Sequence, residues 1–489
     1  MTRLNTLVKN VTVVRPDAGA DDGEQLDLGI TDGKFSRLEA NIEADEADAV
    51  VDGRGLLAFP GAVDGHQHWG IYNSLEDDTD TESRASAQGG VTTGITYMRT
   101  GKYYLNTGGP YREFFPKVLA ASEGRSFIDY AFHLAPMSRE HIEEIPSIIT
   151  DLGVTSFKIF MFYGSHGLHG ASADQSSFLM IPPDERYDVA HFEFVMRGIA
   201  KARAEHPELA DQISLSLHCE TAEIMTAYTK MVQTAGSLSG LEAYSASRPP
   251  HSEGLAVTTA SFLADETGLP NINLLHLSSA KALTAAMRMQ ETFPHVDFRR
   301  EVTIGHLLAD ITTAHGLGGK VNPPLRPRDD VEALWEHMLA GNLDWVVSDH
   351  ACCKDEQKFG DPRDDIFAAK SGFGGAEYLL PGLVSEGRKR GLTYKRIAEL
   401  TSWAPARRYA LPTKGTIAVG YDADFCLVDP SATWTVHAED SESTQEYTPF
   451  EGFELNARVT DTWVRGQQVL EKGAIVGAPT GHFLRRGQP

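Results

Sequence analysis

Short apolar runs alternate with longer helix-like segments through the middle of the chain. Nearly continuous apolar strands separated by helices indicate a parallel sheet that is covered on both faces. Eight such units within about 300 residues predict a (β/α)8 barrel, and a doubly wound open sheet is the alternative. The helix-like segments include His191–Glu205 and Ala280–Thr292. The eight apolar runs are Leu57–Val63, Val91–Tyr97, Phe127–Leu134, Thr155–Met161, Ile213–Leu217, Ile272–Leu277, Val296–Val302 and Leu343–Val347.

Both chain ends show a different pattern, one of short strands and turns. We expect residues 1–57 and 411–489 to form one small composite β-sandwich domain, and residues 58–410 to form the barrel. Asp32 and Gly33 have the residue types of a hairpin turn. The predicted fold class is therefore α/β, a TIM-like barrel with an appended β domain. The candidate end strands are Val11–Val14, Asp27–Ile30, Phe35–Leu38, Gly415–Val419, Asp424–Val428, Thr433–Val436, Val459–Val464 and Gln467–Leu470.

The chain of 489 residues is acidic, with 44 Lys and Arg residues against 68 Asp and Glu residues and a net charge of −24. This charge disfavours nucleic acid, which needs a basic face, and it disfavours anionic membranes. The four cysteines, two of them adjacent, form no disulfide framework and indicate a reducing compartment. No apolar run approaches about 18 residues and no signal-peptide pattern is found, so we expect a cytoplasmic protein without membrane association.

The segment Pro60–His68 carries the strongest local motif, an H-x-H pair directly after an apolar strand. In an extended chain residues i and i+2 point the same way, so His66 and His68 would present two imidazoles together. They would lie at the rim where barrel enzymes keep their active sites. An isolated pair of this kind also arises from packing, but its position after a strand favours a metal site.

Three later strands end in residues of the same chemical kind: His218, His276 and Asp349. Each alone is more often a satisfied polar residue than a metal ligand. Nitrogen and oxygen donors at four separate strand ends favour zinc or another borderline divalent metal.

Lys158 lies inside an apolar strand, where a buried ammonium is costly. A lysine that reaches solvent or pairs with a carboxylate is the structural alternative. The functional hypothesis is a lysine carbamylated by CO2 (N6-carboxylysine), whose two oxygens bridge two metal ions. Tyr163 follows the strand, and its phenol could donate a hydrogen bond to an oxyanion, with a rim aromatic as the alternative.

Other catalytic motifs are incomplete. The chain has no G-x-S-x-G and no C-x-x-C, and no G-x-G-x-x-G follows a strand, which weakens the open-sheet alternative. His218-Cys-Glu220 matches the H-x-E of zinc nucleobase deaminases, but their P-C-x-x-C is missing. Cys352 and Cys353 are interpreted as small packing residues.

The ordered motifs resemble those of the amidohydrolase superfamily, in its hydantoinase/dihydropyrimidinase branch, over nearly the whole chain. They are PGAVDGHQH, Gly89-Gly-Val-Thr-Thr93, GVTSFKIFMFY, LHCE, SRPP, LLHLSS, KVNPPLR, SDHA, SGFGGAE and KGTIAVGYDADFCLVD.

The resemblance implies a binuclear metal centre. It assigns His66, His68 and Asp349 to the more buried metal, His218 and His276 to the other, and a carbamylated Lys158 and a hydroxide to the bridge. It also implies that Asp349 shuttles a proton to the leaving nitrogen, that Tyr163 stabilises the oxyanion, and that Asn322 and Ser371 bind substrate. Members are commonly homotetramers and sometimes homodimers.

The chain departs from the branch at several positions. Gly70 replaces the arginine by which dihydroorotases grip a carboxylate, and Trp69 beside it offers an aromatic surface for substrate. Asn322 and Ser371 replace the usual serine and asparagine, which puts the standard substrates in doubt. Extra length at Gly164–Phe178 is either a neutral insertion or a lid.

Three hypotheses follow. The first is a binuclear hydrolase, with zinc expected and manganese or iron compatible, that opens a cyclic amide, imide or ureide ring. The second is an allantoinase or an imidase for a non-standard ring. The third is a non-catalytic scaffold homologue, which the complete ligand set disfavours.

Overall fold

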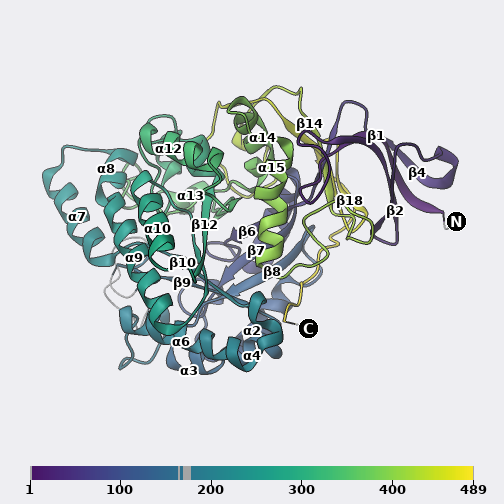
Figure 1. Ribbon diagram of the computed structural model, residues 1–489. Coiled ribbons are helices and arrows are strands. Elements are labelled where there is room, and N and C mark those ends of the chain that lie inside the picture. The colour runs from purple at the N-terminus through teal and green to yellow at the C-terminus, as the bar shows by residue number, and fades with distance from the viewer. Residues whose placement is uncertain (1–2, 164–165, 169–177, 488–489) are drawn as a thin grey trace.

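A computed structural model describes residues 3–163, 166–168 and 178–487 (Figure 1). Eight parallel strands pair in chain order and form a barrel. The barrel closes where Gln67 and His350 form a parallel bridge and His68 N donates to His350 O over 2.8 Å. The strands are β6(Ala62–Gln67), β7(Val91–Met98), β8(Asp129–Leu134), β9(Ser156–Phe160), β10(Ser214–His218), β11(Asn271–Leu274), β12(Asp297–Thr303) and β13(Trp345–Val347).

Helices surround the barrel, and this confirms the predicted fold class (Figure 1). Helix cover on the outside and packed side chains inside explain why most barrel strands are buried along their whole length. The α-helices are α1(Leu75–Gln88), α2(Tyr111–Ser122), α3(Arg139–Glu143), α4(Ile145–Thr150), α6(Val189–Glu205), α7(Ala222–Ala235), α8(Gly240–Ser247), α9(Pro250–Thr267), α10(Ala280–Thr292), α11(Ile304–Leu308), α12(Arg328–Leu339), α13(Asp355–Lys358), α14(Leu379–Lys389), α15(Tyr394–Ala398) and α16(Ala404–Arg408).

The first predicted barrel strand is divided between two sheets. Residues of β5(Leu57–Pro60) pair outside the barrel, and β6 begins after Gly61. Gly61 N donates to Asp424 O over 2.9 Å, so the chain leaves one sheet at this residue and enters the other. A Cβ at Gly61 would lie 2.0 Å from Thr92 Oγ1, and only glycine fits this crossing.

The two chain ends share one mixed nine-stranded sheet, drawn in purple and yellow beside the barrel (Figure 1). Phe35 and Phe425 lie on strands that are not neighbours in this sheet, yet their ring centroids are 5.7 Å apart. The sheet therefore curls around its own core, and the composite β domain is confirmed. Its strands are β1(Leu4–Val13), β2(Glu24–Thr31), β3(Lys34–Glu39), β4(Ala47–Asp52), β5, β14(Phe425–Asp429), β17(Arg458–Val464), β18(Gln467–Glu471) and β19(Ala474–Ile475).

Two predicted end strands differ from the structure. The segment Gly415–Val419 forms no strand, because its chain turns, with Tyr421 N donating to Ala418 O over 3.0 Å. The predicted strand Thr433–Val436 contains β15(Trp434–Thr435), which pairs with β16(Glu454–Leu455) in a separate two-stranded sheet. The domain boundaries at residues 57/58 and 410/411 stay predictions.

The C-terminal segment runs along the barrel wall. Phe483 bridges to Tyr130 of β8, and the buried Arg486 guanidinium donates to Ser156 Oγ over 2.8 Å. A Cβ at Gly481 would lie 1.8 Å from Ile128 O, so the close approach requires glycine. Within the described ranges, no helix has the length and apolar character needed to cross a bilayer.

Candidate active site

Four of the predicted metal ligands meet at the carboxyl ends of β6, β9 and β13. His66 Nε2 lies 3.3 Å from His68 Nε2 and 2.9 Å from Asp349 Oδ1. Lys158 Nζ lies 3.1 Å from His68 Nε2 and contacts His66 Nε2 as well. All four side chains are buried. Three donor atoms this close together, from His66, His68 and Asp349, match the spacing of a metal site.

His218 and His276 complete the cluster from β10 and from the residues after β11. Their ring centroids are 4.2 Å apart, and the His276 ring lies 5.3 Å from that of His66. The Nδ1 atoms of His218 and His276 are buried without a hydrogen-bond partner among the described residues. A buried nitrogen without a partner is costly, and a metal ion would satisfy it.

Partners behind the histidines fix which ring nitrogen faces the centre. His66 Nδ1 lies 2.8 Å from Glu301 Oε1, and His218 Nε2 lies 2.7 Å from Glu220 Oε2. Carboxylates that accept from the far nitrogen of a ligating histidine orient the ring and raise its basicity. Arg248 pairs with Glu220, its Nε lying 3.0 Å from Glu220 Oε1.

Sequence reasoning missed these supporting residues. Tyr104, whose hydroxyl lies 2.7 Å from His68 Nδ1, gave no pattern that could have indicated its role. Glu301 was detectable, since it is an acidic residue within an apolar run, like Lys158. Glu220 was visible in the H-x-E motif, but it lies behind His218 and is no deaminase acid.

Burial and neighbouring charges shift the pKa values of Lys158 and Asp349. Burial lowers the pKa of Lys158 to about 7, so a large share of its amine is neutral at neutral pH. A neutral amine is the form that adds to CO2. Burial alone would raise the pKa of Asp349, but His66 and His68 hold it well below its ordinary value.

The backbone at two candidate ligands is in the left-handed region. His276 has φ of 32° and Asp349 has φ of 53°. For residues other than glycine such conformations cost about 1–3 kcal/mol and concentrate at functional sites. They turn both side chains inward directly after their strands.

A cavity opens beside the cluster. Two of the predicted substrate-binding residues, Asn322 and Ser371, line it. Asn322 Oδ1 accepts from Tyr244 OH over 2.5 Å and its Nδ2 donates to Leu168 O over 3.0 Å. Its side chain is therefore engaged by the protein, which leaves main-chain groups for a ligand. The lining residues are His68, Ile71, Phe160, Leu168, His218, Val321, Asn322, Asp349, Ala351, Ser371 and Gly372.

Trp69 differs from its prediction. Its side chain is fully buried, packs near Tyr130 at a centroid distance of 6.3 Å and does not line the cavity. Gly70 has φ of 77° and turns the chain, so Ile71 faces the cavity in place of Trp69. The turn at Gly70 thus determines which residue of the loop Trp69–Tyr72 reaches the cavity.

Tyr163 lies one ring away from the cavity. It stacks on Phe160 at 4.5 Å, and Phe160 stacks on His218 at 4.7 Å. Burial raises the pKa of Tyr163 to about 12, so the phenol keeps its proton and can donate it in a hydrogen bond. Most of the predicted insertion Gly164–Phe178 lies outside the described residues, which include only 166–168 and Phe178 of it.

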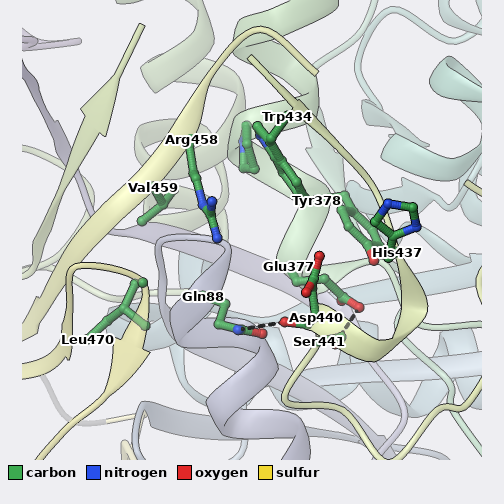
Figure 2. Close-up of a pocket in the computed structure, with 12 residues that line it drawn as sticks. Gln88, Glu377, Tyr378, Trp434, His437, Asp440, Ser441, Arg458, Val459 and Leu470 are labelled. Atoms are coloured by element: carbon green, nitrogen blue, oxygen red, sulfur yellow. Dashed lines mark hydrogen bonds between the residues drawn. The ribbon is translucent and has the colours of Figure 1, made fainter. Parts of the chain in front are cut away.

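Another pocket lies between helices α1 and α14 and the residues from Trp434 to Gly473 (Figure 2). Gln88 Nε2 donates to Asp440 O over 3.2 Å and Ser441 Oγ donates to Glu377 Oε1 over 2.9 Å (Figure 2). These bonds attach residues 440 and 441 to the barrel. None of the predicted site residues lines this pocket.

Comparisons with known proteins agree with the motifs. Residues 256–469 match the model of the amidohydrolase family. The chain is 33% identical to an allantoinase of Rubrobacter xylanophilus over 99% of this chain and 98% of the relative. It is 28% identical to a D-hydantoinase of Rhizobium radiobacter over 99% of each. A solved dihydropyrimidinase from Brevibacillus agri superposes with a TM-score of 0.84 at 26% identity over 98% of both chains.

Proposed function

The chain belongs to the amidohydrolase family, and from that premise we propose that it is a metal-dependent hydrolase that opens a cyclic amide or ureide ring. The observation that carries the proposal is the convergence of four histidines, Lys158 and Asp349 at one rim of the barrel. The carboxylates of Glu301 and Glu220 support the proposal. Each holds one ring nitrogen of His66 or His218, so that the other ring nitrogen faces the centre, as in histidines that bind metal.

We propose that the cluster holds two divalent metal ions, with zinc as the metal that the nitrogen and oxygen donors suit best. His66, His68 and Asp349 would hold one ion, and His218 and His276 the other. Lys158, carbamylated by CO2, would contribute an oxygen to each. The buried site around Lys158 supports this, since a carbamate removes the unfavourable buried ammonium.

Bound metal ions would supply Lewis acidity and lower the pKa of a water to near neutrality. Asp349 would take the proton of the attacking water, and its contacts with His66 and His68 at the centre of the cluster support this role. It would then deliver that proton to the ring nitrogen that leaves. Tyr163 would donate its hydroxyl hydrogen bond to the oxyanion that forms on the attacked carbonyl.

The cavity lining supports a ring with an apolar substituent, such as a substituted hydantoin or dihydropyrimidine. Ile71, Leu168 and Val321 line it, and among the described residues no Arg or Lys does. An allantoinase is the second candidate, favoured by the similarity to that relative. An imidase that opens another ring is the other part of this second candidate, and succinimide turnover tests it.

Turnover of hydantoin, dihydrouracil, allantoin and succinimide, measured side by side with zinc, tests these assignments. We expect the hydantoin or the dihydrouracil to be opened fastest. Allantoin opened alone would select the second candidate. No turnover and no bound metal after careful purification would indicate the scaffold homologue.

We further propose a cytoplasmic homotetramer or homodimer. Phe194 on α6 and Phe262 on α9 are each 56% exposed, and such apolar side chains on outer helices support self-association. The four cysteines are all buried and unpaired, which supports a reducing compartment. Light scattering of the purified protein measures the assembly.

A further inference from the structure

Arg99, directly after β7, is a buried cation that has no counter-ion among the described residues. Its side chain is fully buried, and among the described residues it forms no ion pair. Nη1 donates to Thr100 O over 2.9 Å, whereas Nε and Nη2 have no hydrogen-bond partner within residues 3–163, 166–168 and 178–487. No hydrogen bond or ion pair among the described residues joins the Arg99 guanidinium to any of the six candidate metal ligands. A buried guanidinium with unsatisfied donors is costly, so its presence calls for a reason.

Aromatic rings surround the guanidinium. Its central carbon lies 5.2 Å from the ring centroid of Tyr163, 5.4 Å from that of Tyr104 and 4.6 Å from that of Phe178. Ring faces attract a cation, but they compensate a buried charge only in part. Two of these rings belong to the candidate active site, since Tyr104 supports His68 and Tyr163 is the proposed oxyanion donor.

Neither Arg99 nor Tyr163 lines the cavity beside the candidate metal ligands, and only Tyr163 has a contact with substrate in the proposed function. A Cβ at Gly101 would lie 2.6 Å from Arg99 Nη1, which shows how tightly the guanidinium is enclosed. Any effect on the reaction must therefore pass through a neighbouring side chain. The Tyr163 hydroxyl is also buried without a hydrogen-bond partner in the part of the chain that the structure describes, and it is the neighbour with a proposed chemical role.

We propose that Arg99 is a positioning residue for Tyr163, whose buried positive charge holds the phenol in place and strengthens its hydroxyl as a donor to the oxyanion. The inference rests on the proposed function. A nearby cation makes a phenol a stronger donor, because it stabilises the electron density that shifts onto the phenol oxygen as the hydrogen bond forms. Arg99 also opposes the rise that burial causes in the pKa of Tyr163, which agrees with this effect.

A double-mutant cycle tests the inference by kinetics. We expect Arg99→Met to lower kcat by about tenfold, with KM within about twofold, and Arg99→Lys to recover part of the loss. If Arg99 acts through Tyr163, then adding Arg99→Met to Tyr163→Phe should cost little more. Losses that multiply in the double variant would overturn the inference.

A readout independent of turnover keeps the inference testable if the proposed function fails. 3-Fluorotyrosine is placed at position 163, and its 19F chemical shift is titrated with pH. We expect Arg99→Met to move the phenol transition to higher pH. Arg388→Met is the matched control, because its guanidinium lies over Tyr394 at 4.2 Å, away from this site, and it should move nothing.

An unchanged 19F transition in Arg99→Met would overturn the inference whether or not the protein opens rings. Absence of ring opening by the wild type would instead contradict the proposed function. Thermal unfolding adds a third measurement. The unfolding midpoint of Arg99→Met should be equal to or above that of the wild type, because an uncompensated buried charge is removed. A clearly lowered midpoint would identify Arg99 as structural.

Discussion

Replacing Glu301 by glutamine should weaken metal binding without a change of shape. Glu301 is fully buried and accepts three hydrogen bonds. Its Oε1 lies 2.8 Å from His66 Nδ1 and 3.2 Å from His276 N, and its Oε2 accepts from Trp345 Nε1 over 2.9 Å. Glutamine keeps the volume but turns one oxygen into an NH2 donor. In either orientation of the amide, at least one buried donor then faces another donor.

The size of the effect follows from these contacts. Loss of the carboxylate lowers the basicity of His66 and loosens the orientation of its ring. Changes of this kind typically reduce metal affinity about 10- to 100-fold, or roughly 1.4–2.7 kcal/mol. The unsatisfied buried donor should also lower the free energy of unfolding by about 1–3 kcal/mol.

Zinc affinity is measured by competition with a chromogenic chelator, and unfolding by urea titration of the metal-free protein. Glu253→Gln is the matched control, since Glu253 is equally buried but pairs with Arg326 and contacts no candidate ligand. It should lose stability and keep its zinc affinity within about twofold. Wild-type zinc affinity in Glu301→Gln would refute the assignment of His66 as a ligand held by Glu301.

Three further predictions test other parts of the molecule. Lys158→Ala should lose bound metal and activity together, and full activity without metal, measured by elemental analysis and turnover, would exclude the proposed centre. Burial lowers the pKa of Lys358 to about 7, whereas an unfolded lysine titrates near 10.4, so the free energy of unfolding should rise with pH between these values. Lys358→Met should reduce the slope of unfolding free energy against pH by up to about 1.4 kcal/mol per pH unit, measured by urea titrations at pH 7.5 and 9.5. An equal slope in both proteins would contradict the lowered pKa of Lys358. Gly481→Ala should lower the unfolding midpoint through its clash with Ile128 O. Gly254→Ala should not, because an added Cβ in helix α9 would lie 3.7 Å from Ala285 Cβ; equal midpoints in the two variants would contradict the docking of the C-terminal segment.

The sequence alone was sufficient for the barrel and for the six residues that the structure brings together. Apolar runs mark the strands, and all strands of a parallel barrel end at one rim. A polar residue just after a strand is therefore placed near the others by topology. His66, His218 and Asp349 could be grouped in this way although they lie far apart in the chain.

Tertiary structure decided what surrounds that cluster. The His66–Glu301 hydrogen bond joins residues 235 positions apart, and no local pattern specifies which ring nitrogen it occupies. Trp69, expected to offer an aromatic surface to the substrate, is instead buried, because Gly70 turns the chain and Ile71 lines the cavity. The environment of Arg99 also arises from rings on separate segments. Local periodicity fixes the strands and their ends, whereas side-chain partners and charges depend on contacts between distant segments, which only the folded chain provides.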